Sequence, residues 1–302
     1  VVDAALEQIK LQLESDSPFF NVIWYGTPHS PFKASEADNA DFRSLDEQSM
    51  HHYGELVALD RSIGTLRKGL RDLGIEKETK VWYCSDNGGL PKITPATTGG
   101  LRGNKGLIFE GGLRVPGIIE WPGTIAARTT EFPASVMDMM PTLLELAGVQ
   151  HPASERPRDG ISLTGLFDGP SASETARDEP ICFRYRAKAA IVDNDWKLLA
   201  QDRRKDQFQL YNLKSDPAES NDVSAMFPER KTQLQRQLRQ WLASTDASSE
   251  GKDYPEGRVA ADHPKPEFWI DRVEYQPYLE QWKNRWEYGS WIERRKKSKT
   301  AK

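Results

Sequence analysis

The apolar positions in the first half of the chain alternate between helical and strand-like spacing. Apolar residues recur every three or four positions in residues 1–13 and again in residues 46–73, where Gly74 is expected to end the helix. Short apolar runs predict buried strands at residues 21–25, 81–84 and 117–121. The succession of strand, helix and strand is typical of a parallel sheet in an α/β fold.

The middle of the chain and the part that follows it show shorter elements. Residues 136–147 predict a helix that carries Pro141 in its first turn, with Asp138 as a cap rather than a catalyst. Residues 156–180 are rich in Pro, Gly, Ser and charge, which predicts a linker or surface excursion. A small antiparallel sheet with a helix is predicted by apolar patterns at residues 181–185, 189–192, 196–200, 208–212 and 231–242.

The last part of the chain, residues 246–302, is rich in aromatic residues and ends in a basic tail. Four of the aromatic residues recur at helical spacing: Tyr275, Tyr278, Trp282 and Trp286. Aromatic faces often line sugar sites, but periodic aromatic residues more often pack, so packing is the favoured interpretation. The chain is therefore expected to divide into residues 1–155, 156–180, 181–245 and 246–302.

Composition narrows the class of protein. The 302 residues are 37% hydrophobic and carry a net charge of −4, which argues against global disorder and against non-specific nucleic-acid binding. No apolar run in the sequence approaches the roughly 18 residues of a membrane-spanning helix. Cys84 and Cys182 lie in strand-like apolar runs and are expected to be free, structural thiols. No signal peptide is visible at the start of the sequence.

The segment from residue 81 to residue 116 carries most of the candidate chemistry. Its first strand runs directly into Asp86 and Asn87, which places hard oxygen atoms where open α/β sheets bind their ligands. Calcium and magnesium prefer such ligands, although a calcium shell of about six to eight oxygens needs further donors from elsewhere. On its own, Ser-Asp-Asn-Gly-Gly favours a simple turn, and only its combination with LRGNKG and EGGLRVP favours a site. Lys105 follows as a point charge suited to a tetrahedral oxyanion, so the segment predicts a metal-assisted site for an anionic group.

The ordered motifs of the chain resemble the second half of the catalytic domain of a sulfatase, in the alkaline-phosphatase-like superfamily. The motifs are PFFNVIWYGTPHSPF (18–32), SDNGG (85–89), LRGNKG (101–106), EGGLRVP (110–116), EWPG (120–123), PTLLELAGV (141–149) and YNLKSDPAESNDV (211–223). The resemblance covers residues 1–245. It implies an α/β fold with an alkaline-phosphatase-like parallel sheet core, incomplete at the N-terminus, and a smaller C-terminal antiparallel sheet with a helix.

The same resemblance implies roles for individual residues. Asp86 and Asn87 match metal ligands, usually for Ca²⁺, with Mg²⁺ less favoured. Lys105 matches the lysine that contacts the sulfate. His29 matches a histidine that faces the sulfate ester and helps the leaving group depart, although without the other motifs a packed loop histidine would be the favoured interpretation. The implied substrate is a sulfated small molecule or glycan, and the implied location is the periplasm, the extracellular space or the lysosome.

The nucleophile of the family is not found in this sequence. Sulfatases use a formylglycine made from the Cys or Ser of a C/S-x-P-x-R motif, and neither Cys84 nor Cys182 lies in such a motif. The early paired aspartates and the Lys-x-His pair of the family are also not found. We expect a missing N-terminal portion to contribute them and this chain alone to be inactive. A related phospho- or phosphonate-ester hydrolase and a non-catalytic sulfated-glycan-binding remnant are the alternatives.

Overall fold

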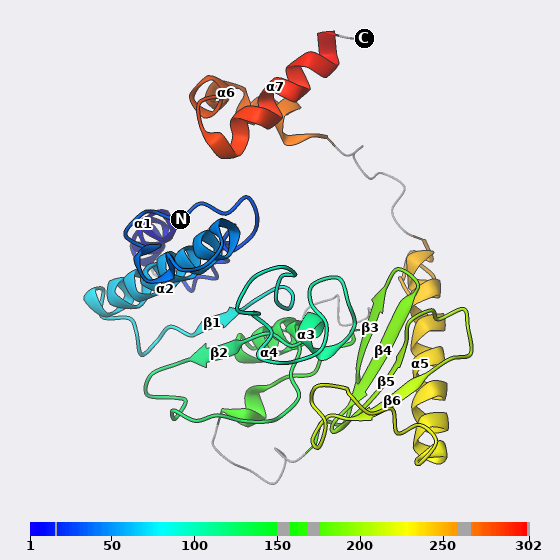
Figure 1. Ribbon diagram of the computed structural model, residues 1–302. Coiled ribbons are helices and arrows are strands. Elements are labelled where there is room, and N and C mark those ends of the chain that lie inside the picture. The colour runs from blue at the N-terminus through cyan, green and yellow to red at the C-terminus, as the bar shows by residue number, and fades with distance from the viewer. Residues whose placement is uncertain (16, 150–157, 168–175, 259–266, 301–302) are drawn as a thin grey trace. The chain divides into compact units, whose positions relative to one another are not determined.

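The computed structural model describes residues 1–302 except for 16, 150–157, 168–175, 259–266 and 301–302 (Figure 1). The chain forms two compact units, residues 1–257 and residues 258–302, which we call the main unit and the tail unit. The main unit contains both sheets and the motif-bearing loops, and the tail unit is helical.

The main unit begins with the two predicted helices, which pack on each other. They are α1 (Val2–Leu13) and α2 (Glu47–Asp72). Asp46 caps α2 by accepting a hydrogen bond from the Ser49 amide at 3.0 Å, and Gly74 follows its end with a φ of +71° that favours glycine. The contact between the helices buries Val2, Ile9, Leu66 and Leu70.

The first sheet departs from the prediction of parallel strands. β1 (Val81–Cys84) and β2 (Gly117–Glu120) form where strands were predicted, but they pair antiparallel, with Val81 opposite Glu120. The predicted strand at residues 21–25 is wrong as a paired strand, because this extended segment makes no backbone hydrogen bond to another described part of the chain. Its apolar alternation supplies packing, but a strand also needs a neighbour that offers hydrogen-bonding groups.

The extended segment at residues 18–25 nevertheless has two distinct faces. Its inner side chains pack on the cluster between α1 and α2, and they are Phe19, Ile23 and Tyr25. Its outer side chains are exposed, and they are Phe20, Val22 and Trp24. Trp24 is 85% exposed. Such exposure is unusual, because a tryptophan side chain has a large apolar surface and is buried in most proteins.

The predicted helix at residues 136–147 is confirmed as η2 (Val136–Asp138) followed by α4 (Met139–Leu146). The predicted capping role of Asp138 is confirmed as part of a capping box, in which Ser135 is the N-cap and the Asp138 carboxylate accepts the Ser135 amide at 2.8 Å. It is also fully buried and binds both terminal nitrogens of the Arg177 guanidinium, each at 2.8 Å. Residues 158–167 contain η4 (Thr164–Leu166), and the rest of the expected excursion up to residue 175 lies outside the described residues.

The second sheet of the main unit agrees with the prediction. It is antiparallel, in the order β3-β4-β5-β6. Its strands are β3 (Ile181–Tyr185), β4 (Lys188–Asp193), β5 (Trp196–Ala200) and β6 (Gln209–Asn212), and α5 (Pro228–Ser249) lies along one face (Figure 1). Side chains that are entirely buried fill this face, among them Leu198, Leu210, Leu234 and Leu238.

The opposite face of the second sheet is covered by the glycine-rich residues 101–116, which carry the LRGNKG and EGGLRVP motifs and which we call the motif segment. Ile108 and Phe109 of that segment pack on Ala190, Leu199 and Tyr211 of the sheet. Because both faces are covered, the sheet is the best-buried part of the main unit. The motif segment and the small sheet therefore form one packed body.

The tail unit has its own small core. It contains η6 (Trp269–Asp271), η7 (Val273–Tyr275), α6 (Gln276–Trp282) and α7 (Trp286–Thr300). The core consists of Ile270, Leu279 and Ile292, with Trp269, Trp282 and Tyr288 packed against it. Packing is thus confirmed for part of the aromatic pattern, whereas Tyr278 is 49% exposed and the side chain of Trp286 is not described.

Candidate functional site

Asp86 and Asn87 lie directly after β1, at its carboxyl end. Asp86 is exposed and Asn87 is half-buried. The Asn87 amide nitrogen donates a hydrogen bond to Oδ1 of Asp86 at 3.0 Å, so the two head groups lie side by side. The main-chain oxygen of Asn87 accepts the Ser85 hydroxyl at 3.0 Å, so the side-chain Oδ1 of Asn87 and Oδ2 of Asp86 are left as acceptors for a ligand.

The turn that follows these residues interlocks with α3 (Glu110–Leu113). The Gly88 amide donates to the carbonyl oxygen of Gly112 at 3.0 Å. A Cβ atom at Gly88 would lie 2.2 Å from the carbonyl oxygen of Gly111, so only glycine fits at this position. The glycines of the two motifs thus allow two backbone segments to touch, and the contact fixes the orientation of Asp86 and Asn87.

Lys105 belongs to the same set of interlocked turns. Its amide donates to the carbonyl oxygen of Gly89 at 2.8 Å, and its turn is closed by Gly103 and Gly106, whose φ angles are +83° and +86°. The side chain is half-buried, and its Nζ makes no hydrogen bond or ion pair with any residue that the structure describes. The structure therefore joins the lysine turn to the Asp86–Asn87 turn and leaves the ammonium group free to bind an anion.

His29 lies in an exposed loop outside this set of turns. Its Nδ1 lies 2.8 Å from the carbonyl oxygen of Ser30. Since a carbonyl oxygen can only accept, Nδ1 carries the hydrogen, and Nε2 is the ring nitrogen left for a ligand. No hydrogen bond or aromatic contact of the described residues joins His29 directly to Asp86, Asn87 or Lys105.

Two polar residues of α2, Ser49 and Glu55, hold the loop after His29 and the loop after the Asp86–Asn87 turn. Glu55 accepts the amide of Lys33 at 2.7 Å, four residues after His29. Ser49 accepts the amide of Thr94 at 2.9 Å, a few residues after Gly89. The same helix therefore anchors both loops of the predicted site.

The paired histidines of α2, His51 and His52, have structural roles. Nδ1 of His51 accepts the Ala34 amide at 3.2 Å. His52 is buried with its ring edge-on to Phe32 at 5.2 Å, and burial lowers its pKa. Burial also raises the pKa of the neighbouring Glu55 carboxyl. These groups brace the loop rather than line the candidate site.

Sequence reasoning missed a buried ion cluster beneath α3. The Lys197 ammonium, with no exposed side-chain area, donates to Glu110 at 2.8 Å and lies 2.9 Å from Glu219 without an aligned hydrogen bond. Glu219 in turn accepts the backbone amide of Glu110 at 2.6 Å. Burial raises the pKa of Glu219, an effect that Lys197 opposes. The available signal was a lysine in the middle of the apolar run of β5, which requires a buried partner.

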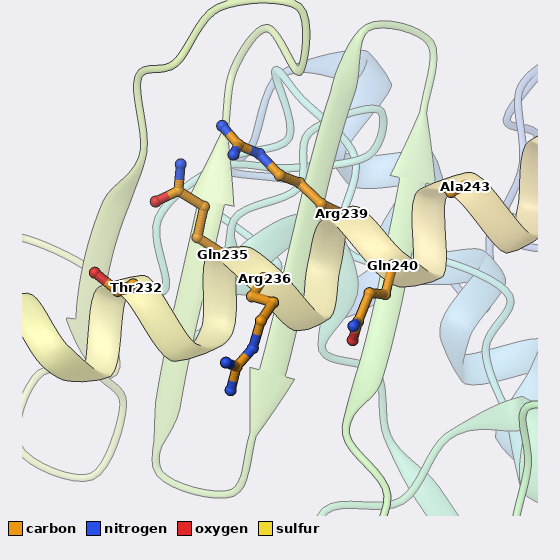
Figure 2. Close-up of a pocket in the computed structure, with 6 residues that line it drawn as sticks. All are labelled: Thr232, Gln235, Arg236, Arg239, Gln240 and Ala243. Atoms are coloured by element: carbon orange, nitrogen blue, oxygen red, sulfur yellow. The ribbon is translucent and has the colours of Figure 1, made fainter.

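A shallow hollow on the exposed face of α5 contains none of the predicted site residues (Figure 2). All of its lining residues come from this one helix: Thr232, Gln235, Arg236, Arg239, Gln240 and Ala243. Gln235 and Arg239 both bind the Asp206 carboxylate, each at 2.6 Å. The hollow is therefore a solvated helix face with local ion pairs.

The described residues contain no cluster of three or more His, Cys, Asp or Glu that could hold a metal ion. Asp86 and Asn87 offer oxygen atoms, which fit a hard cation but can supply only part of its coordination shell.

Among the helices in the described ranges, none combines the length and apolar character needed to cross a bilayer.

Comparison with known proteins identifies the family. The profile of the family described as "Sulfatase" matches residues 1–149, and that of "N-sulphoglucosamine sulphohydrolase, C-terminal" matches residues 103–248. A sulfatase of Formosa agariphila is 30% identical over 277 residues, which are 81% of this chain and 50% of that protein. The N-acetylgalactosamine-6-sulfatase of Mus musculus is 38% identical over 194 residues, 62% of this chain and 35% of that protein.

The architecture leads to the same family. The solved structure of Ps i-CgsB in complex with k-i-k-neocarrahexaose matches with a TM-score of 0.70 and 29% identity, covering 80% of this chain and 53% of that one. The fold is thus the α/β, alkaline-phosphatase-like fold with a small C-terminal antiparallel sheet. The chain belongs to the sulfatase family, and it spans about half the length of the curated relatives it matches.

Proposed function

We propose that this chain is part of a sulfuric ester hydrolase that cleaves sulfate esters on a carbohydrate. The observation that carries the proposal is the interlocked set of turns that joins Lys105 to Asp86 and Asn87. A carbohydrate substrate is supported by the mouse relative, named for N-acetylgalactosamine 6-sulfate, and by Ps i-CgsB, solved with an oligosaccharide.

Two side chains of this chain would act on the substrate. The free ammonium of Lys105 would bind the sulfate oxygens and stabilise the negative charge that grows on them in the transition state. His29 would hold a proton on Nε2 and deliver it to the departing sugar oxygen, because Nδ1 is already engaged with Ser30. Both groups would need to face one substrate, which the shared anchoring by α2 supports.

The metal and the nucleophile would complete the site. Asp86 and Asn87 would hold Ca²⁺, with Mg²⁺ less favoured, and the ion would place positive charge beside the sulfate oxygens. The formylglycine nucleophile would come from an N-terminal portion of the same protein, as would the other metal ligands.

An exposed apolar face on the main unit supports the proposal that the fold includes an additional portion. The outer side chains at residues 20, 22 and 24 are apolar and exposed, and the segment has no strand partner among the described residues. An exposed apolar face next to unpaired backbone groups marks an interaction site. We propose that the part of the fold corresponding to the unmatched half of the relatives covers this face, and that export places the protein in the periplasm, outside the cell or in a lysosome.

The test is the activity of the full-length protein toward an aryl sulfate and a sulfated sugar. Lys105→Ala should lower kcat/KM by roughly a hundredfold or more, because the sulfate loses its cation, whereas Lys10→Ala on exposed α1 should not. Chelation should abolish turnover, and Ca²⁺ should restore it. Wild-type activity in Lys105→Ala would remove this residue from the site. Turnover of phosphate or phosphonate esters alone would favour the related hydrolase, and sugar binding without turnover would favour the glycan-binding remnant.

A further inference from the structure

Lys197 occupies an environment that few lysines share. Its side chain has no exposed area, and its neighbours are carboxylates from two separate segments, Glu110 of α3 and Glu219 of the loop after β6. An ammonium group in such a place destabilises the fold unless it is paired, so its persistence indicates that the pairing holds something together. What it joins is the second sheet on one side and the motif segment on the other.

The motif segment passes this attachment on to the candidate site. Glu110 is the first residue of α3, and the carbonyl oxygen of Gly112, in the same short helix, accepts the Gly88 amide. Gly88 follows Asn87 directly, and the neighbouring Gly89 accepts the amide of Lys105. A shift of α3 would therefore move the Asp86–Asn87 turn and the turn that carries Lys105 together.

The packing around α3 leaves no room for such a shift to be absorbed. A Cβ atom at Gly111 would lie 2.4 Å from the carbonyl oxygen of Gly103, and one at Gly112 would lie 2.2 Å from that of Leu107. Backbone segments in direct contact transmit a displacement instead of damping it.

We propose that Lys197 is a positioning residue of the candidate sulfate site, which it supports by holding α3 against the second sheet. The proposal rests on the proposed function for the meaning of the site, but its structural part concerns only this chain. Lys197 does not touch the substrate. It acts through Glu110 and α3 on the turns that carry Lys105 and the Asp86–Asn87 pair.

No other cation in the cluster can replace Lys197. The Arg102 guanidinium donates to the main-chain oxygen of Glu219 at 2.8 Å and stacks on Phe109, so it does not engage the carboxylates. Arg114 lies 3.9 Å from Glu110 and is 62% exposed. Removal of the Lys197 charge would leave the carboxylates of Glu110 and Glu219 facing each other in a buried site.

The first experiment measures amide hydrogen exchange in Lys197→Met and in Lys214→Met, whose lysine is 76% exposed. Lys197→Met should exchange at least about tenfold faster in peptides that cover residues 86–89 and 101–113, while α1 and α2 keep wild-type protection. Lys214→Met should match wild type throughout. Unchanged exchange in the two motif peptides, or an equal increase over the whole main unit, would overturn the proposal.

A charge-balanced variant keeps the test valid if Lys197→Met fails to fold. Lys197→Met combined with Glu219→Gln removes one of the two facing charges and leaves Glu110 beside Arg114. This double variant should fold, and its exchange in the motif peptides should lie between that of Lys197→Met and wild type. Exchange in those peptides at the wild-type rate would show that the lysine holds nothing there.

Activity separates positioning from general stabilisation. In the full-length enzyme, at a temperature where all variants are folded, Lys197→Met should raise KM for the sulfate ester and weaken inhibition by inorganic sulfate, each by about tenfold. A purely structural residue would change the amount of folded enzyme but neither constant. If wild type shows no sulfatase activity, the proposed function fails, while the exchange experiment still decides whether Lys197 supports the turns.

Discussion

Two regions of the main unit, the second sheet and the extended segment at residues 18–25, differ in how completely their apolar faces are covered. The second sheet is buried on both faces, by α5 on one side and by the motif segment around Ile108 and Phe109 on the other. The N-terminal region packs only the inner side chains of residues 18–25 on its helices, and Trp24 of the outer face is 85% exposed. The second sheet is therefore a closed structure, whereas the N-terminal region presents an open apolar face.

This contrast separates residues that stabilise the chain as it stands from residues that await a partner. Strand-like alternation is present in both regions, so alternation alone does not tell them apart. In the second sheet it reflects burial already achieved within this chain. In residues 18–25 it reflects a face whose burial, under our proposal, depends on another portion of the fold.

The largest expected effect comes from breaking the buried ion pair between Arg177 and Asp138. Arg177→Met would leave the fully buried Asp138 carboxylate without its cation, so the free energy of unfolding should fall by about 3–5 kcal/mol. Urea unfolding followed by far-UV circular dichroism measures this change. Arg204→Met removes an exposed pair with Asp202 and should change stability little. Equal effects of the two variants would mean that burial does not govern these pairs.

A matched pair of apolar truncations tests the contrast directly. Leu234→Ala opens a cavity in the core between α5 and the second sheet and should lower the free energy of unfolding by about 2–5 kcal/mol. Val22→Ala removes a side chain that is 57% exposed and should stay within about 0.5 kcal/mol. The same urea titration compares them. A large loss in Val22→Ala would show that the outer face is already covered.

The smallest expected effect is a pH dependence in the open region. Hydrogen bonds from Arg61 and Ser35 lower the pKa of Asp38 to about 2. The pKa of an aspartate in an unfolded chain is about 3.9. The stabilisation by Asp38 is therefore complete above that pH and is lost as the pH falls toward 2. The difference in unfolding free energy between wild type and Asp38→Asn should therefore shrink between pH 6 and pH 2. A difference that is constant with pH would contradict the assignment, and Arg61→Gln should show the same shrinkage.

Much of the secondary structure was predictable because it depends on local pattern. The helix at Glu47–Asp72 follows from its apolar stripe, its Asp46 cap and Gly74, and the strands of the second sheet follow from short apolar runs between turns. Strand pairing was not predictable in the same way. β1 and β2 were located correctly, but their antiparallel pairing depends on which strand lies beside each of them.

The candidate site shows the same division. The sequence located Asp86, Asn87 and Lys105 through motifs, and the structure adds that their turns are joined by backbone hydrogen bonds through Gly89 and α3. His29 was located by the same means, but its relation to the other residues stays a prediction. Lys197 and Glu219 were missed because their partners lie far away in sequence.

The family, the longer helices of the main unit, the location of most strands and the candidate residues follow from the sequence, because they depend on motifs and on local periodicity. The core shared by the motif segment and the second sheet, and the buried lysine that joins them, are seen only in the folded chain. The reason is that burial and charge pairing arise between residues separated along the chain, and local pattern carries no information about such distant partners.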